Sequence, residues 1–218
     1  MRRRFSAFTL VELLVVISII GLLAGLSVPA LQRSRSAADQ AVCTANLKGL
    51  GQALNTYVGE GGTFPPVRVT TGRGSGATSQ IWTDFLRDAG LATTNSAFSV
   101  NKGKNGYWYC PAALKSQTPI GINSTTYGYN GSVAGIPVVR IAKPSQTALI
   151  LDGAWDSGSG YAEAIPPSRM PRPVHPPTKQ NDSPTAGINI CFVDGHVEMR
   201  KLGTLPTQTN DIFWSGQE

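Results

Sequence analysis

The chain has 218 residues, of which only 15% are charged, and it contains 24 glycines and 15 prolines. This composition favours one membrane segment followed by one loop-rich sheet domain, and it disfavours a helical bundle. The formal charge of +6 falls to +3 without the arginines at positions 2–4, so the charge is weak support for nucleic-acid binding and none is expected.

An apolar segment follows these arginines near the N-terminus. The nineteen residues from Leu13 to Leu31 carry no charge, and as a helix they would span about 28 Å, close to the thickness of a bilayer core. The positive-inside rule leaves the N-terminus in the cytoplasm and carries the rest of the chain across the membrane. Pro29 lacks an amide donor and is expected to kink the helix.

One interpretation of this segment is a secretory signal peptide. It would be cleaved after Ala30, where Val-Pro-Ala forms a small-residue pattern. This interpretation gives no role to Glu12, although a carboxylate at the bilayer centre costs about 2.5 kcal/mol or more. It also leaves Phe8 and the apolar residues after it on the charged side of the segment.

A second interpretation rests on the stretch SAFTLVELLVVISIIGLLAGLSVPAL, at positions 6–31. It closely resembles the class III signal of type IV prepilins and type II secretion pseudopilins. The resemblance implies that a prepilin peptidase on the cytoplasmic face cleaves between Ala7 and Phe8, and that the new amino group of Phe8 is methylated. The family usually has glycine before the cut, where this chain has Ala7.

The second interpretation explains Glu12. Cleavage creates a positive amine on Phe8, one helical turn before Glu12, and the two charges can pair within one chain or between neighbours. Such a pair fixes the register of one helix against the next, whereas an unpaired charge is a penalty. The family implies that this pairing guides insertion into a filament. The alternative is that Glu12 only reaches the lipid head groups.

The helix is expected to continue beyond the membrane to Val58. Apolar residues recur there every three or four positions, at Leu47, Leu50 and Leu54, which predicts one apolar face. The glycines and prolines of GEGGTFPP, at 59–66, end it. We therefore expect one helix from Phe8 to Val58, half in lipid and half packed on a head domain.

The rest of the chain is expected to form the head. A short helix is predicted over 81–91, where Trp82 and Phe85 face the core, after a flexible loop over 70–79. Short stretches of β-formers then predict strands at 106–111, 126–131, 137–142 and 147–153. Because no βαβ alternation is visible, the sheet should be mainly antiparallel. The proline-rich stretch 157–184 is expected to be an exposed loop.

The segment 188–202 predicts a β-hairpin. Asp194-Gly195 is a strong signal for a two-residue type I′ turn. The resulting register places two apolar pairs on one face, Phe192 with Val197 and Ile190 with Met199.

This hairpin, together with TYGYNG and RIAKPSQTALILD upstream, resembles a large group of pilin-like proteins of planctomycete and verrucomicrobial bacteria. Their signature joins a histidine, nine residues later, to an Asp-Gly. Here Pro184 occupies the position of the histidine, and eighteen residues separate His175 from Asp194. The spacing therefore assigns no role to His175.

The three cysteines, Cys43, Cys110 and Cys191, form no CxxC pair and have no histidine cluster beside them in the sequence, so no metal site is predicted. A disulfide between Cys110 and Cys191 and three buried thiols are both compatible with the sequence, and the pairing stays open.

Acidic residues near turns, Asp152, Asp156 and Asp194, lie in stretches without the alternating oxygen ligands of a calcium loop, and turn formation is the simpler explanation. His196 adjoins the last of them. Because the chain has no G-x-S-x-G nucleophile elbow, a hydrolase is disfavoured. No enzymatic activity and no cofactor are expected.

Together these features predict an α+β protein, with a long pilin-like helix packed on a mainly antiparallel sheet. The expected parts are a leader (1–7), a transmembrane assembly helix (8–31), the periplasmic half of the helix (32–60) and the head (61–218). The resemblance implies a pilin or pseudopilin subunit of the inner membrane, with the prepilin peptidase and other pilin-like subunits as partners. The alternative is an exported or anchored cell-envelope binding protein that does not polymerise.

Overall fold

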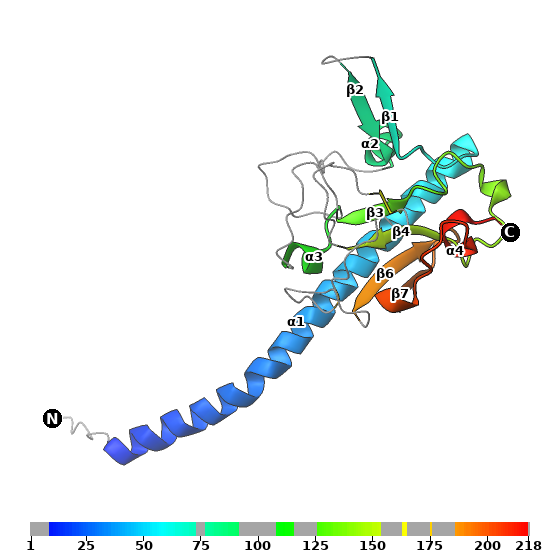
Figure 1. The fold of residues 1–218 in the computed structure, drawn as a ribbon. Coiled ribbons are helices and arrows are strands. Elements are labelled where there is room, and N and C mark those ends of the chain that lie inside the picture. The colour runs from blue at the N-terminus through cyan, green and yellow to red at the C-terminus, as the bar shows by residue number, and fades with distance from the viewer. Residues whose placement is uncertain are drawn as a thin grey trace. The chain divides into compact units, whose positions relative to one another are not determined.

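The computed structural model describes residues 9–72, 77–91, 108–115, 126–153, 163–164, 175 and 186–217. Contacts divide the chain into two compact units, Met1–Ala38 and Asp39–Glu218. One long helix, α1 (Leu10–Gly61), contributes to both units (Figure 1). The last part of α1, residues 39–61, therefore belongs to the same unit as the sheet.

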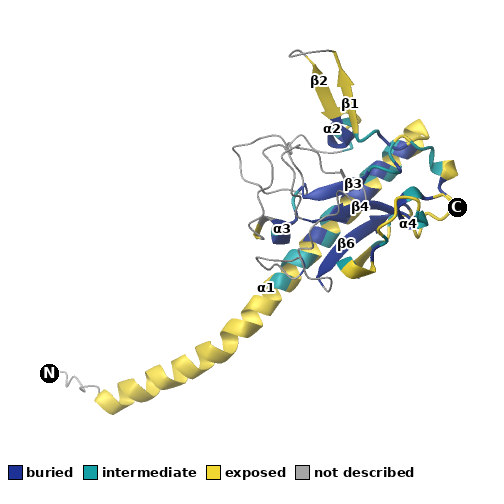
Figure 2. Cartoon of the chain, viewed as in Figure 1, coloured by how far each residue is buried: buried dark blue, intermediate teal, exposed yellow. Residues whose placement is uncertain are grey.

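In the first unit, α1 is apolar and exposed. Every side chain from Leu10 to Leu31 is exposed (Figure 2), and the helix is long and apolar enough to cross a membrane. The Ser18 and Ser27 hydroxyls each donate a hydrogen bond to the carbonyl four residues earlier, at 2.8 and 2.7 Å, which satisfies them without a solvent partner. The helix continues through Pro29, and the kink expected there stays a prediction.

In the second unit, α1 buries one stripe of side chains. The members recur every three or four residues, as a helix packed on one side requires: Cys43, Leu47, Leu50, Leu54 and Val58. Gly51 lies in this stripe, and a Cβ there would collide with the Cys191 sulfur, whereas nothing lies within 4 Å of the same position at Gly49. The helix ends at Gly61, three residues beyond the expected end.

The head contains a five-stranded sheet with the order β5-β3-β4-β6-β7. Its strands are β3 (Tyr127–Asn130), β4 (Ala148–Asp152), β5 (Glu163–Ala164), β6 (Gly187–Phe192) and β7 (Val197–Lys201). The β3–β4, β4–β6 and β6–β7 pairs are antiparallel, and the β3–β5 pair is parallel. The expectation of a mainly antiparallel sheet is confirmed.

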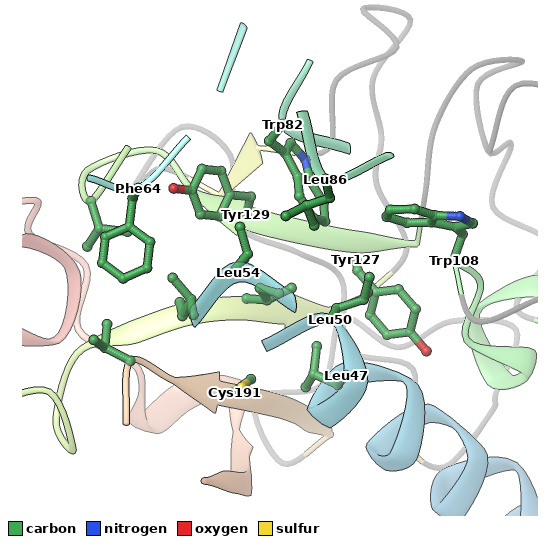
Figure 3. Close-up of a cluster of buried hydrophobic side chains, with 14 of the residues drawn as sticks. Leu47, Leu50, Leu54, Phe64, Trp82, Leu86, Trp108, Tyr127, Tyr129 and Cys191 are labelled. Carbon is green, nitrogen blue, oxygen red and sulfur yellow. The ribbon is translucent and has the colours of Figure 1, made fainter. Parts of the chain in front are cut away.

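Both faces of the sheet are covered, so every residue of β3, β4 and β6 is buried. On one face, the leucine stripe of α1 packs among Tyr127, Tyr129 and Trp82 (Figure 3). Another cluster joins Phe213 and Trp214 to side chains of β4 and β6: Ala148, Leu151, Ile188, Ile190 and Phe192. Full burial of one such large apolar side chain stabilises the fold by about 1.5–3 kcal/mol.

The C-terminal cover is a short helix, α4 (Ile212–Ser215), preceded by the 3-10 turn η3 (Leu202–Thr204). The Asp211 carboxylate caps α4 by accepting a hydrogen bond from the Phe213 amide at 2.8 Å. The Asn130 side chain of β3 donates to the carbonyls of Ala148 and Trp214, at 2.7 and 2.9 Å. This buried amide therefore joins the centre of the sheet to α4.

The predicted helix and two of the predicted strands are present as α2 (Trp82–Asp88), β3 and β4. Trp82 is buried and Phe85 is half-buried.

The strand expected at 106–111 is wrong over its described residues, 108–111, because they form a turn and the start of α3 (Pro111–Lys115). Proline suits the first position of a helix, where its missing amide costs nothing. The strand expected at 137–142 is also wrong, because a 3-10 turn, η2 (Val138–Arg140), occupies it.

Two expected loops contain regular structure. Residues 70–79 contribute to a hairpin of β1 (Arg68–Thr71) and β2 (Thr78–Ile81), across which the Thr71 and Thr78 hydroxyls lie 2.8 Å apart. The proline-rich stretch contributes β5 and a buried His175, which forms an antiparallel bridge with Gly187. The expectation of an exposed loop is therefore wrong at these positions, and the other residues of 157–184 lie outside the described residues.

The hairpin of β6 and β7 forms with a register one residue away from the expected one. Asn189 pairs with Met199 and Cys191 with Val197. The turn is a three-residue loop, since the Gly195 amide donates to the Phe192 carbonyl and the Phe192 amide to the His196 carbonyl, both at 2.9 Å. Gly195 has a φ of 89°, as a type I turn followed by a glycine bulge requires.

This shift places Val197 with Cys191 on the α1 side of the sheet, rather than beside Phe192. Because side chains alternate along a strand, a slip of one residue moves the side chains of β7 to the opposite face of the sheet from the partners expected on β6. Cys191 lies in the core cluster with α1, whereas Ile190 and Phe192 lie in the cluster with α4. The predicted pairing of Phe192 with Val197 and of Ile190 with Met199 is wrong, since it assumed the two-residue turn.

Candidate functional site

Glu12 forms a reciprocal cap at the start of α1. Its carboxylate accepts hydrogen bonds from the Thr9 amide at 2.9 Å and from the Thr9 hydroxyl at 2.7 Å. The Glu12 amide donates to the Thr9 hydroxyl at 3.3 Å, and the Thr9 carbonyl accepts from the Leu13 amide. This is a capping box, in which residue 9 is the N-cap and residue 12 the third helical position.

The capping box places the carboxylate beside the start of the helix. The Thr9 amide that it binds belongs to the peptide bond with Phe8, so the next nitrogen towards the N-terminus is that of Phe8. Ala7 and Phe8 lie outside the described residues. The motif T-x-x-E is a capping signal in the sequence, which neither the charge-pairing nor the head-group interpretation of Glu12 uses.

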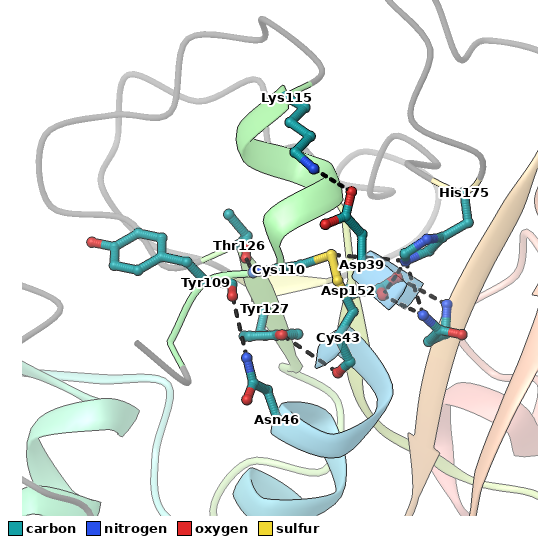
Figure 4. The surroundings of a disulfide bond; sticks show 11 residues. Asp39, Cys43, Asn46, Tyr109, Cys110, Lys115, Thr126, Tyr127, Asp152 and His175 are labelled. Atoms are coloured by element: carbon teal, nitrogen blue, oxygen red, sulfur yellow. Dashed lines mark hydrogen bonds and ion pairs between the residues drawn. A yellow bond between two sulfur atoms is a disulfide. The ribbon is translucent and has the colours of Figure 1, made fainter. Parts of the chain in front are cut away.

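A disulfide joins Cys43 of α1 to Cys110, immediately before α3 (Figure 4). The expected alternatives, a Cys110–Cys191 bond and three free thiols, are therefore both wrong. The Thr126 hydroxyl accepts from the Cys110 amide, and the Tyr127 hydroxyl donates to the Cys43 carbonyl at 3.4 Å. Lys115 forms an ion pair with Asp39 on the same side of α1. The bond thus ties α1 to the segment before β3.

Cys191 is the free cysteine, buried in β6 beneath α1. Burial raises the pKa of its thiol to about 12, and the negative charge of Asp194 adds to the effect. A neutral thiol is a weak nucleophile and a weak metal ligand. Its role is therefore packing against Gly51.

A buried polar network lies where β4 ends. Asp152 accepts a hydrogen bond from the Asn189 amide at 2.8 Å and another from the Asn189 side chain at 2.7 Å. The His175 ring nitrogen Nε2 lies 2.8 Å from the second Asp152 oxygen. The backbone of His175 bonds to that of Gly187, so β6 positions both partners of the carboxylate. Sequence spacing assigned no role to His175, because eighteen residues separate it from Asp194 where the family signature has nine.

This network adjoins the disulfide. The Cys110 sulfur lies 3.8 Å from the His175 Nε2 (Figure 4). One ligand-type atom from each of Cys43, Cys110, Asp152 and His175 lies within 4.8 Å of the other three, and all four residues are buried. The sequence predicts no metal cluster, because the four residues come from widely separated segments.

The hairpin turn contains the other histidine–aspartate pair. The Asp194 carboxylate accepts a hydrogen bond from the His196 amide at 3.1 Å and lies 2.6 Å from its ring nitrogen Nδ1. Burial raises the pKa of Asp194, but the His196 contacts outweigh it and hold the pKa below its usual value. Asp152 and Asp194 lie at opposite ends of the β4–β6 pair, where Leu151 pairs with Ile190 and Ala148 with Phe192. They therefore form no common calcium site, and Asp156 lies outside the described residues.

The chain has an exposed apolar helix at its N-terminus and a head in which the same helix packs on an antiparallel sheet, which is the arrangement of a pilin-like α+β fold. Comparison with known proteins agrees with this class. Residues 2–28 match the prokaryotic N-terminal methylation motif.

Two curated proteins resemble the chain, and both are type II secretion system core protein G. The protein from Aeromonas hydrophila is 41% identical over 64 residues, which cover 29% of this chain and 45% of the relative. The protein from Dickeya chrysanthemi is 38% identical over 77 residues, which cover 35% and 48%. The chain thus spans about half the length of these relatives, and no solved structure gave a significant match. The motif and the two relatives support assignment of the chain to the family of pilins and pseudopilins.

Proposed function

We propose that the chain is made as a prepilin and is anchored in the inner membrane. Residues 1–7 would be the leader, 8–31 the transmembrane helix, 32–60 its periplasmic continuation and 61–218 the head. A prepilin peptidase would cleave between Ala7 and Phe8 on the cytoplasmic side, and the new amine would be methylated. The match of residues 2–28 to the methylation motif carries this proposal.

The mature subunit would act by assembly rather than by catalysis, in a type IV pilus or a type II secretion pseudopilus. The exposed apolar surface of α1 needs lipid or neighbouring helices to cover it. Glu12 would pair with the Phe8 amine of its own or a neighbouring chain. The capping box supports this role, because it holds the carboxylate at the amide and hydroxyl of Thr9, the residue that follows Phe8 in the sequence.

Intact-mass analysis of the protein purified from membranes tests the processing step. We expect a mature chain that begins at Phe8 and carries one methyl group. A chain that begins at Leu31 would show that the segment is an ordinary signal peptide, and the filament proposal would fail with it. Ala7→Gly should be cleaved at least as completely as the parent, because glycine is the usual residue at that position in the family.

Crosslinking between N-terminal helices of neighbouring subunits tests the docking role. Glu12→Ala removes both the cap and the charge, whereas Thr9→Ala removes much of the cap and keeps the charge. If Glu12 guides docking, Glu12→Ala should lose the crosslinks and Thr9→Ala should keep most of them. Equal loss in both variants would assign Glu12 to helix capping alone. Correct processing without crosslinks in the parent would favour the non-polymerising envelope protein.

A further inference from the structure

The buried groups around the disulfide have the composition of a zinc site. We propose that Cys43, Cys110, Asp152 and His175 bind one Zn²⁺ ion when the disulfide is reduced, so that disulfide and metal are mutually exclusive states of one site. The proposal goes beyond assembly and does not depend on how the N-terminus is processed. Two sulfurs, one imidazole and one carboxylate favour zinc over magnesium or calcium, which prefer oxygen ligands.

The four ligand-type atoms lie near enough to one another to bind a single ion. Zinc–ligand bonds of about 2.0–2.3 Å place neighbouring ligand atoms roughly 3.3–3.8 Å apart. The Cys110 sulfur and the His175 Nε2 are already 3.8 Å apart, and all four ligand-type atoms lie within 4.8 Å of one another. Asp152 and His175 are somewhat closer, at 2.8 Å. Formation of the site therefore needs rotation of the two cysteine side chains and a small separation of this pair.

The electrostatics of the site also favour a cation. Asp152 is fully buried and His175 is 4% exposed, and a buried carboxylate is costly unless it is paired and hydrogen-bonded. Within the described part of the chain, its hydrogen bonds come from Asn189 and His175. A divalent ion would compensate the negative charge of Asp152, and Asn189 would orient the carboxylate through its hydrogen bonds to both oxygens.

The disulfide state converts to the zinc state in two steps, reduction and metal binding. A phosphine reductant and one water convert the disulfide to two thiols and become the phosphine oxide. Zinc then displaces the two thiol protons and binds the thiolates, the Asp152 carboxylate and the neutral ring of His175. Cys191 takes no part, because it lies outside the cluster of four.

Metal titration of the full chain in detergent tests the proposal. The protein is reduced with the phosphine, freed of reductant without oxygen, and titrated with Co²⁺ and then Zn²⁺. We expect one metal per chain, with the thiolate-to-cobalt charge-transfer band and the visible bands of tetrahedral cobalt, which Zn²⁺ then removes. The oxidised chain should show neither band nor stoichiometric zinc.

Matched variants distinguish this site from unspecific binding to thiols. Cys191→Ser should titrate like the parent, and Cys43→Ser should lose the charge-transfer band. His175→Gln and Asp152→Asn should weaken zinc binding by more than the roughly 10- to 100-fold typical of a residue that only hydrogen-bonds to a metal ligand. If the reduced chain unfolds without metal, zinc should restore its circular dichroism spectrum in the parent but not in His175→Gln. Absence of stoichiometric binding, or binding that is insensitive to His175→Gln, would overturn the proposal.

Discussion

Two parts of α1 present apolar side chains in opposite ways. In residues 10–31, apolar residues occur around the whole helix and all are exposed, with Leu22 at 66% and Leu26 at 69%. In residues 39–61, they form one stripe in which Leu47, Leu50 and Leu54 are fully buried. A helix that is apolar all round suits a membrane or a bundle, and a helix with one apolar stripe suits the surface of a globular core.

The comparison shows that one continuous helix has a part with exposed apolar side chains and a part with buried ones. The apolar stripe of the second part is buried against side chains of β3, β4 and β6. Within the part of the chain that the structure describes, the side chains of residues 10–31 are all exposed, so we expect lipid or other helices to cover them. Substitutions in the two parts should therefore affect different measurements.

The largest difference should come from leucine truncation. Leu50→Ala leaves a cavity in the core of the head and should lower the free energy of unfolding by about 2–5 kcal/mol. Leu22→Ala should change it by less than about 0.5 kcal/mol, because that side chain is exposed in the chain. Urea unfolding of the detergent-solubilised protein, followed by tryptophan fluorescence, measures both. Equal losses would contradict the division of α1 into two parts.

A smaller effect separates two neighbouring glycines of the same helix. Gly51→Ala directs a Cβ onto the Cys191 sulfur and should cost about 1–3 kcal/mol through overpacking. Gly49→Ala meets no atom within 4 Å and should stabilise by roughly 0.5–1 kcal/mol, because alanine is the better helix former. The same unfolding experiment compares them. The double variant Gly51→Ala/Cys191→Ala should recover most of the loss, and failure to do so would place the strain elsewhere.

The smallest effect concerns pH and is confined to the head. The pKa of Asp194 lies below its usual value of 3.8, so the unfolded chain binds more protons than the folded chain just below that value. The stabilisation is therefore present above about 3.8 and is lost as the pH falls through the lower folded pKa. Because Asp194 is 37% exposed, the effect should stay below about 1 kcal/mol.

The difference in urea midpoint between the parent and Asp194→Asn measures this effect. It should shrink between about pH 5 and about pH 2. A difference that stays constant over this range would show that the His196 contacts do not stabilise the carboxylate. Substitutions in residues 10–31 should leave the pH dependence of head unfolding unchanged.

Local patterns predicted the elements that depend on near neighbours. The leucine spacing identified the buried stripe of α1, and the apolar run identified its first part. The turn residues identified the β6–β7 hairpin. The predicted register was wrong by one residue, because the true register also depends on the bulge at Gly195. The capping box of Thr9 and Glu12 corresponds to the motif T-x-x-E, but Glu12 was interpreted only as a charge partner or as a contact of lipid head groups.

By itself, the sequence determined the apolar N-terminal helix, the amphipathic helix that continues from it and the mainly antiparallel head, because hydropathy and periodicity are local properties. Only the tertiary structure decided that Cys43 pairs with Cys110 and that His175 reaches Asp152 and Asn189. These contacts join residues between 14 and 67 positions apart. Which distant residues meet depends on how the strands pair and on how α1 packs on them, and no spacing along the chain encodes that.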